Sequence, residues 1–223
     1  MVKLAAIALD YDGTIARNDV LSEGTREAIA AARRQGIKVL LATGRILNDL
    51  QRVAGDLHFV DAVVAENGAV LHFPDSGRTS ILAPPISEAF VAELGRRNIS
   101  CRQGRCLIDS DARDGPRLLE VIRSLELPLV LVFNSGRVMT LPQGVSKATG
   151  LRSALDALRL SAHNTVAVGD AENDHELLRL AEVGVAVAWA SAALRVAADV
   201  VLDDPGPESV AAYIQTLTRT VQL

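Results

Sequence analysis

The residues that decide the fold of this chain are 4–14, which read LAAIALDYDGT. Residues 4–9 form an unbroken apolar run, as is typical of a strand that is buried on both faces of a parallel sheet. Two acidic residues, Asp10 and Asp12, follow the run at once. In open α/β sheets, ligands bind beyond the carboxyl ends of the strands. The stretch therefore predicts a strand inside a sheet that delivers two carboxylates to a binding site.

Apolar runs and amphipathic stretches alternate after this strand. In the first part of the chain, we expect further strands over 37–42 and 62–65 and helices over 24–35 and 46–54. In the last part, the alternation predicts helices over 147–158, 174–181 and 192–197 and strands over 165–168, 185–188 and 200–202. Strand–helix–strand units of this kind favour a parallel sheet with right-handed crossovers. The fold class is therefore α/β, with a Rossmann-like parallel-sheet core.

Residues 84–142 interrupt the alternation, and prolines lie near both of their ends. Here the pattern predicts helices over 87–97 and 116–125 and strands over 100–108, 129–133 and 137–140, with a hairpin turn at 134–136. Prolines at such positions suit a domain boundary. We therefore expect a core made of residues 1–83 and 143–223, with a small α+β cap domain, residues 84–142, inserted into it.

The composition is that of an ordinary globular protein. Of the 223 residues, 49% are hydrophobic and 22% are charged, and the formal net charge is −4. This balance offers no bulk positive charge to hold nucleic acid or an anionic membrane. Two cysteines, Cys101 and Cys106, are too few for a disulfide framework, and the N-terminus lacks a signal peptide or a membrane-spanning length. We therefore expect a cytoplasmic protein.

Asp10 and Asp12 are candidate catalytic residues. One carboxylate at a strand end can attack phosphorus and form an aspartyl-phosphate. A second carboxylate, two residues away, can protonate the leaving oxygen and then activate water. Gly13 allows the backbone to approach a phosphate closely. The alternative is a plain strand-end turn, in which Asp-Gly is common.

Two further segments suit the binding of phosphate. Residues 42–45, ATGR, close the second expected strand, and the Thr43 hydroxyl and the backbone at Gly44 can contact phosphate oxygens. Alternatively, Thr43 caps the following helix. Lys147 opens a helix, where the helix dipole disfavours a cation, so an anion is a reasonable partner for this residue. The alternative is a solvated surface lysine.

Residues 169–174, GDAEND, follow the fourth expected strand of the core and carry three acids and an amide. Such a concentration of oxygen ligands suits Mg²⁺, which binds one or two carboxylates together with substrate phosphate. The alternative is a helix N-terminal charge at Asp174 in an otherwise solvated loop. All four segments follow strand ends of one predicted sheet, which favours a single site.

The chain resembles the haloacid dehalogenase-like hydrolase superfamily over nearly its whole length. The resemblance rests on DYDGT at 10–14, TGR at 43–45, Lys147 and GDAEND at 169–174. The segment ENGA at 66–69 and a cap inserted between the second and third of these motifs are similar to the Cof-type subgroup. The short cap looks like the compact (C2-type) caps of phosphoglycolate phosphatase-like and sucrose-phosphatase-like members.

This resemblance implies a Mg²⁺-dependent phosphatase that hydrolyses small phosphate monoesters, such as sugar phosphates or phosphoglycolate, through an aspartyl-phosphate. It implies Asp10 as the nucleophile and Asp12 as the general acid and base. The remaining implied roles are phosphate binding by Thr43, Gly44 and Lys147, metal binding by Asp10, Asp12 (through its carbonyl), Asp170 and Asp174, and support from Asn67 and Asn173. The implied partner is a small phosphorylated metabolite, with no membrane and no nucleic acid, and the oligomeric state stays open.

Two alternatives remain beside this interpretation. A phosphotransferase or mutase of the same superfamily would use the same aspartyl-phosphate. A regulatory domain of a larger protein would keep the fold without turnover, although such domains usually lose a catalytic acid that is present here. The sequence also departs from the Cof-type pattern, since Trp189 stands where an asparagine is usual.

Overall fold

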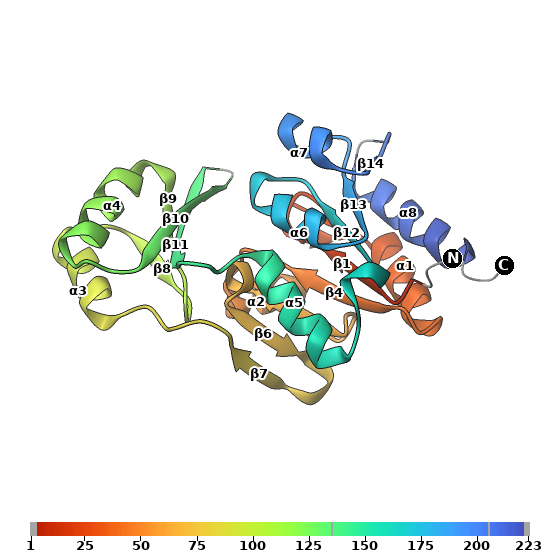
Figure 1. The fold of residues 1–223 in the computed structure, drawn as a ribbon, viewed down its shortest axis with the longest axis horizontal. Helices are drawn as coiled ribbons and strands as arrows, with labels where there is room; N and C mark the ends of the chain where they lie inside the picture. Colours follow the sequence, from red (N-terminus) through yellow and green to blue (C-terminus); the bar gives the residue numbers. More distant parts are fainter. Residues whose placement is uncertain (1–3, 135, 205, 221–223) are drawn as a thin grey trace.

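The computed structural model describes residues 4–134, 136–204 and 206–220. A larger lobe is built on an eight-stranded sheet, and a smaller lobe stands beside its carboxyl-end edge (Figure 1). The strand order in the large sheet is β14–β13–β12–β1–β4–β5–β6–β7. The strands are β1 (Ala6–Leu9), β4 (Lys38–Ala42), β5 (Ala62–Ala65), β6 (Val70–Phe73), β7 (Arg78–Ile81), β12 (Thr165–Gly169), β13 (Val183–Ala186) and β14 (Val200–Val201).

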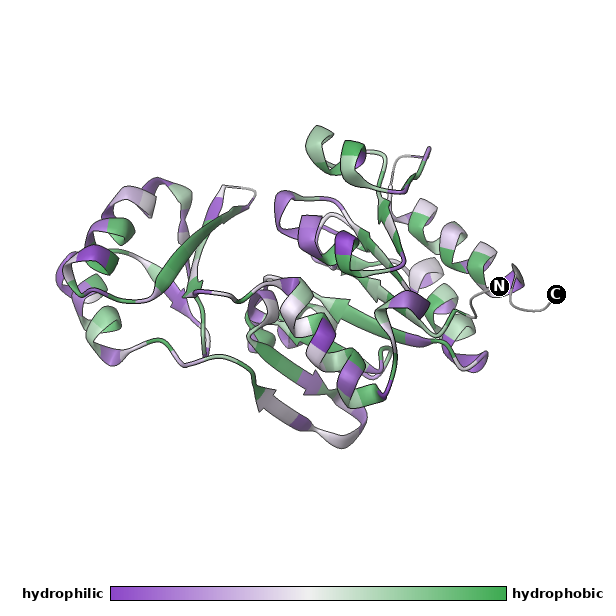
Figure 2. Ribbon diagram, in the orientation of Figure 1, coloured by the Kyte–Doolittle hydropathy of each residue, from purple (hydrophilic) through white to green (hydrophobic). Residues whose placement is uncertain are grey.

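The strand β1 lies inside the sheet, as the sequence predicts. It pairs in parallel with β12 on one side and with β4 on the other. All of its residues are buried, because helices cover both faces of the sheet. Figure 2 shows the apolar residues concentrated in these inner strands. The chain moves outward from β1 in opposite directions through β4 and through β12, which is the switch point at which α/β sheets bind ligands.

Within the described residues, six helices surround this sheet. They are α1 (Glu23–Arg34), α2 (Leu47–Ala54), α5 (Lys147–Leu158), α6 (His175–Leu180), α7 (Ala192–Ala197) and α8 (Pro207–Thr220). Right-handed crossovers in opposite directions from β1 place α1 and α2 on one face and α6 on the other. The helix α8 packs beside α1, and α5 packs beside α6. None of the helices in the described part of the chain combines the length and the apolar character that crossing a membrane requires.

Three parts of the large lobe are not predicted by the sequence. The strands β6 and β7 extend the sheet in antiparallel fashion beyond β5, where left-handed backbone at Glu66 and Asn67 reverses the chain. A short hairpin of β2 (Ala16–Arg17) and β3 (Val20–Leu21), here called the flap, follows the DYDGT segment. The third part is α8. In addition, the strand expected over 185–188 begins and ends two residues earlier, as β13.

The smaller lobe is the inserted segment. Its antiparallel sheet has the order β10–β11–β9–β8, and two helices pack on one face of it. The elements are α3 (Glu88–Arg96), β8 (Cys101–Gln103), β9 (Ile108–Asp111), α4 (Gly115–Ser124), β10 (Leu129–Asn134) and β11 (Arg137–Pro142). Phe90, Leu118 and Val138 belong to a hydrophobic cluster of this lobe's own. Met139 and Leu141 point to the opposite face, where they pack near Ile46 of the large lobe.

One expected element of the cap is wrong. The strand expected over 100–108 is instead split into β8 and β9, which pair with each other in antiparallel fashion. The turn between them has a local hydrogen bond from the Gly104 N–H to the carbonyl of Leu107, and a side chain of the large lobe, Glu66, binds the backbone of Arg105 and Cys106. The turn expected at 134–136 includes Ser135, which lies outside the described residues; its flanking strands β10 and β11 do pair as a hairpin.

Candidate active site

The carboxyl ends of β1, β4 and β12 meet beneath the inner face of the cap. A cleft of about 480 Å³ lies between them. Its floor is formed by residues from four of the segments singled out in the sequence, namely Asp10, Asp12, Thr43, Gly44, Lys147 and Asp170. Its upper wall is formed by cap residues, namely Arg102, Asp109, Asn134, Arg137 and Met139. Segments far apart in the chain are thus gathered at one end of the sheet.

Lys147 is the central charge of the floor. Its Nζ donates to Asp10 Oδ1 at 2.6 Å and to Asp174 Oδ1 at 2.6 Å. All three side chains are at most 5% exposed. Burial alone would lower the pKa of Lys147, but the two carboxylates outweigh burial and hold this pKa above its ordinary value. The interpretation of Lys147 as a solvated surface residue is therefore wrong.

Three carboxylates crowd around this lysine. One oxygen from each of Asp10, Asp170 and Asp174 lies within 4.8 Å of the others. Burial raises the pKa of Asp10 well above its ordinary range against the pull of Lys147, and the charges of Asp174 and Asp170 raise it further. Burial and then Asp174 likewise raise the pKa of Asp170. When ionised, the three carboxylates carry more negative charge than the one ammonium of Lys147 can neutralise. The excess negative charge and the oxygen donor atoms fit a divalent metal ion.

Asp174 differs from the other two acids in how its oxygens are used. One oxygen accepts from Lys147, and the other accepts from the backbone N–H groups of Asp170 and Ala171, each at 3.1 Å. The side chain therefore fixes both the lysine and the loop that carries Asp170. Asp170 is held in addition by the Thr14 hydroxyl, which donates to its Oδ1 at 3.1 Å.

Asp12 lies at the mouth of the cleft, with its side chain 45% exposed. The guanidinium of Arg45 binds both of its oxygens, with Nε at 2.6 Å and Nη2 at 2.5 Å, and also contacts Asp19 of the flap. The hydrogen bond to Asp12 raises the pKa of Arg45 above its ordinary value. The segment TGR contains Arg45, but its spacing does not indicate that this residue binds Asp12, the expected acid and base.

Thr43 and Gly44 close the floor on the side of β4. Thr43 is buried, and its Oγ1 accepts the backbone N–H of Arg45 at 3.1 Å. It does not cap α2, because that helix is preceded by Ile46, so the capping alternative is wrong. At Gly44, an added Cβ would lie 2.9 Å from the sulfur of Met139. The absence of a side chain at this position lets the cap approach the floor.

Polar contacts connect the floor to the cap. Asn173 donates to Asn67 at 3.4 Å and accepts from Asn134 of the cap at 3.4 Å. The carboxylate of Glu66, itself buried, accepts the backbone N–H groups of Arg105 at 3.0 Å and Cys106 at 2.7 Å. Sequence reasoning missed Glu66, although the segment ENGA that contains it was noted.

Two arginines on the cap face the floor. Both bind the carboxylate of Asp109, Arg102 with its Nε at 2.9 Å and Arg137 with its Nη2 at 2.7 Å. Arg102 also contacts Asp49 at 3.2 Å. Neither arginine belongs to a motif that the sequence singles out. In the cap sheet, Arg102 and Met139 are each paired with Asp109, so their side chains lie on the same face. Arg137 lies two residues before Met139 on β11, which places it on this face as well.

Comparison with known proteins places this geometry in a family. The model of the haloacid dehalogenase-like hydrolases matches residues 7–97 and 105–214. The chain is 30% identical over 228 residues to a phosphoglycolate phosphatase of Archaeoglobus fulgidus, with 97% of this chain and 98% of the relative covered.

Two more distant relatives extend the comparison. One is a 5-amino-6-(5-phospho-D-ribitylamino)uracil phosphatase of Bacillus subtilis, 24% identical over 241 residues, with 96% of each chain covered. The other is the crystal structure of a haloacid dehalogenase-like hydrolase from Bacteroides thetaiotaomicron. It superposes with a TM-score of 0.82 at 22% identity, over 96% of this chain and 100% of that one. The last similarity concerns the fold.

Proposed function

This chain belongs to the haloacid dehalogenase-like hydrolases, and we propose that it is a Mg²⁺-dependent phosphatase that hydrolyses small phosphate monoesters. One observation carries the proposal. The buried Lys147 bridges Asp10 and Asp174 beside Asp170, where three strands end beneath a cap. Such a cluster combines a nucleophile, a cation for the phosphoryl group and carboxylates for a metal ion.

The first half of the reaction uses Asp10 and Asp12. A carboxylate oxygen of Asp10 attacks phosphorus, a new O–P bond forms, and the ester O–P bond breaks. The leaving oxygen takes a proton from Asp12, which lies at the solvent-exposed mouth of the cleft. The phosphoryl group then remains on Asp10 as an aspartyl-phosphate, and the alcohol leaves.

The second half restores the enzyme. Asp12, now ionised, accepts a proton from water, and the water oxygen attacks phosphorus. The bond to Asp10 breaks, and inorganic phosphate leaves. During both halves, Lys147, the Thr43 hydroxyl and the backbone at Gly44 bind the phosphoryl oxygens, and Arg45 holds Asp12 in place.

The carboxylates of Asp10 and Asp170 and the carbonyl of Asp12 would hold Mg²⁺, with Asp174 in support and Asn173 and Asn67 bracing the loop. When bound, the ion supplies positive charge that offsets the charge on the transferring phosphoryl group. The donor set supports this assignment, because hard oxygen ligands suit Mg²⁺.

The cleft sets the class of substrate. A volume of about 480 Å³ is in the range of small-molecule sites. Arginine side chains on the cap wall suit the anionic or hydroxylated part of a small ester, and we propose phosphoglycolate or a sugar phosphate. The similar phosphatases of Archaeoglobus fulgidus and Bacillus subtilis are named for phosphoglycolate and for 5-amino-6-(5-phospho-D-ribitylamino)uracil, both small phosphate esters.

The test is a screen of phosphorylated metabolites for release of inorganic phosphate with Mg²⁺, with excess chelator, and with Ca²⁺ in its place. We expect turnover with Mg²⁺ only, because Ca²⁺ prefers more ligands and a looser geometry. Full activity in chelator contradicts the metal assignment. Transfer of phosphate to an added alcohol in preference to water would favour a phosphotransferase.

A further inference from the structure

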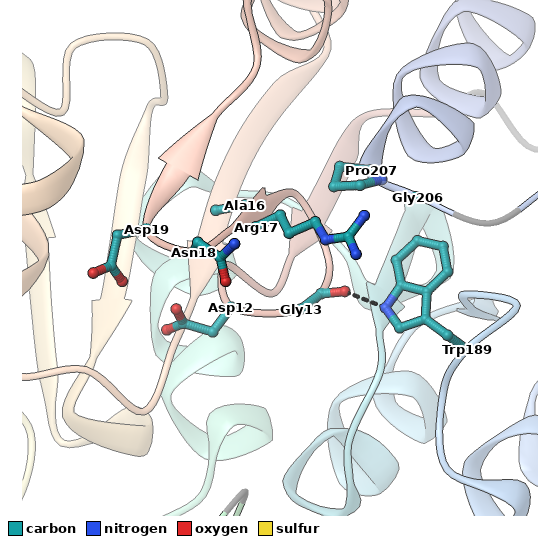
Figure 3. Close-up of a pocket in the computed structure, with 9 residues that line it drawn as sticks. All are labelled: Asp12, Gly13, Ala16, Arg17, Asn18, Asp19, Trp189, Gly206 and Pro207. Atoms are coloured by element: carbon teal, nitrogen blue, oxygen red, sulfur yellow. Dashed lines mark hydrogen bonds between the residues drawn. The ribbon is translucent and has the colours of Figure 1, made fainter.

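Trp189, the one tryptophan of the chain, is hydrogen-bonded to the turn that follows β1. Its indole Nε1 donates to the carbonyl oxygen of Gly13 at 2.7 Å (Figure 3). The residue is 38% exposed, so burial of its ring does not by itself account for this orientation. The contact joins the segment after β13 to the turn after β1, 176 residues earlier.

The Gly13 backbone lies directly against a proposed metal ligand. Its φ is +78°, and an added Cβ would lie 2.3 Å from the Oδ2 of Asp170. The neighbouring Thr14 donates its hydroxyl to the other oxygen of Asp170. The position of the Gly13–Thr14 turn therefore determines the space available to the Asp170 carboxylate.

The segment that carries Trp189 also holds the second carboxylate loop. We call residues 187–191 the brace. The backbone N–H of Val187 donates to the carbonyl of Gly169 at 3.1 Å, and that of Ser191 donates to the carbonyl of Asp170 at 3.0 Å. Two backbone contacts thus fix the brace to the Asp170 loop, and the Trp189 side chain fixes the Gly13 turn to the brace.

We propose that Trp189 is a positioning residue, which sets the distance between the Asp10–Gly13 segment and Asp170 so that both carboxylates meet one divalent cation. This inference rests on the proposed function, and it concerns the side chain at which the chain departs from the Cof-type pattern. The indole N–H is the only part of Trp189 that the coupling requires.

The ring of Trp189 also borders a second cavity. This cavity has a volume of about 520 Å³, and its other lining comes from Asp12 and Gly13, from the flap, and from Gly206 and Pro207 (Figure 3). Asp12, Gly13 and Asp19 line both this cavity and the catalytic cleft. The Gly13 turn therefore separates the second cavity from the catalytic cleft. A movement of this turn caused by binding in the cleft would change the surroundings of the indole.

Two substitutions separate the N–H donor from the ring. Trp189→Phe keeps an aromatic ring without the donor, whereas Trp189→Gln keeps an N–H donor without the ring.

For Trp189→Phe we expect kcat to fall about tenfold, equal to roughly 1.4 kcal/mol and within the range of one hydrogen bond. The Mg²⁺ concentration for half-maximal rate should rise, and KM for the ester should change little. Trp189→Gln should recover most of both losses. Val196→Ala, on an 88% exposed residue of the next helix, is the control and should match the wild type.

The fluorescence of Trp189 provides a readout that is independent of turnover. Because the chain has one tryptophan, titration of the wild type with Mg²⁺ alone, without any ester, should shift its emission. A shift without phosphatase activity on any ester supports the coupling and contradicts the proposed function. Unchanged emission at saturating Mg²⁺ in an active enzyme overturns the inference. So does a Trp189→Phe variant that melts at a lower temperature but keeps the wild-type kcat and Mg²⁺ dependence.

Discussion

At the scale of single residues, the site is organised by one buried cation with two anionic partners. Lys147 lies between Asp10 and Asp174 with almost no access to solvent. A buried charge is tolerable only when it is paired and hydrogen-bonded. Each of the three side chains therefore depends on the others, and their substitutions should affect stability and turnover in different ways.

Asp10→Asn tests the nucleophile. The amide has nearly the same shape but is a far weaker nucleophile. We expect phosphate release to fall by a factor on the order of 1,000 or more. The fold should persist, since Lys147 keeps its contact with Asp174. Phosphate release and thermal melting measure the two effects, with Asp56→Asn on the exposed surface as the control. A variant that turned over near the wild-type rate would falsify the covalent mechanism.

Lys147→Met tests the charge balance. Removing the ammonium leaves Asp10 and Asp174 buried without their cation, and loss of one partner of a buried pair costs about 3–5 kcal/mol. Denaturant unfolding in chelator should show this loss. Mg²⁺ should restore part of it, because a divalent ion replaces the missing charge. Lys38→Met is the matched control, since Lys38 is half exposed in its pair with Asp61 and should cost at most about 1 kcal/mol. Equal losses in the two variants would contradict the central role of Lys147.

At the scale of elements, one connection between core and cap is a side chain of the core that binds backbone of the cap. Glu66 occupies a left-handed backbone position after β5 and accepts two N–H groups of the turn between β8 and β9. The thiol of Cys106, in the same turn, donates to the carbonyl of Ala83, where the chain leaves the core. These contacts hold the cap turn against the point where the chain enters the cap.

Glu66→Ala should destabilise the protein and loosen the cap. The N–H of Cys106 would be left buried without an acceptor, at a cost of about 1–3 kcal/mol. Glu66→Gln keeps one accepting oxygen and should cost less. In both variants KM should rise, because the cap wall no longer has a fixed position above the floor. Denaturant unfolding and steady-state kinetics measure these effects, and Glu182→Ala on the surface is the control. An unchanged KM in Glu66→Ala would show that this contact does not position the cap.

The sequence predicts the elements of the core better than those of the cap. The run at 4–9, the Lys147 helix and the GDAEND loop are recognisable because their burial and their turns are local properties. The hairpin of β8 and β9 is less recognisable, since part of what holds its turn is Glu66, 39 residues earlier in the chain. The flap escapes notice because strands of two residues carry no periodicity.

The distinction between features that local sequence determines and features that depend on distant residues applies to the site as well. Asp10, Thr43 and Asp170 come together because β1, β4 and β12 are parallel and end at one edge, which strand order alone implies. Lys147 joins them from the start of α5, which follows the cap strand β11. Arg102 and Arg137 become neighbours only through the register of β8, β9 and β11, which the sequence does not specify. Arg45 is bound to Asp12 by a side-chain conformation that no spacing rule contains.

At the scale of the whole molecule, the cap is the part that can choose among esters. In the proposed reaction, the contacts of the floor with the phosphoryl group and a metal ion would be the same for every phosphate ester. The cap carries Met139 down to Gly44 and Asn134 to Asn173, so the cleft is narrow between the lobes. A large substrate would have to separate these contacts before its phosphate reached Asp10.

Small phosphate esters should therefore be preferred over macromolecular ones. We expect kcat/KM for phosphoglycolate or a sugar phosphate to exceed that for a phosphopeptide or a 5′-phosphorylated oligonucleotide. A short linker in place of residues 84–142 should reduce this preference. The measurement is a comparison of kcat/KM across these substrates with Mg²⁺ present. A preference of about tenfold or more for either large substrate, roughly 1.4 kcal/mol in transition-state binding, contradicts the role of the cap.

The place of β1 inside the sheet has a consequence for the newly made chain. Its partner on one side, β4, follows within the first residues, but its partner on the other side, β12, comes only after the whole cap. While the ribosome adds the intervening residues, β1 is an edge strand, with apolar side chains and unpaired backbone groups. The cap has a hydrophobic cluster of its own and can fold during this interval. The nascent chain is therefore most prone to aggregation in the period between translation of β4 and arrival of β12.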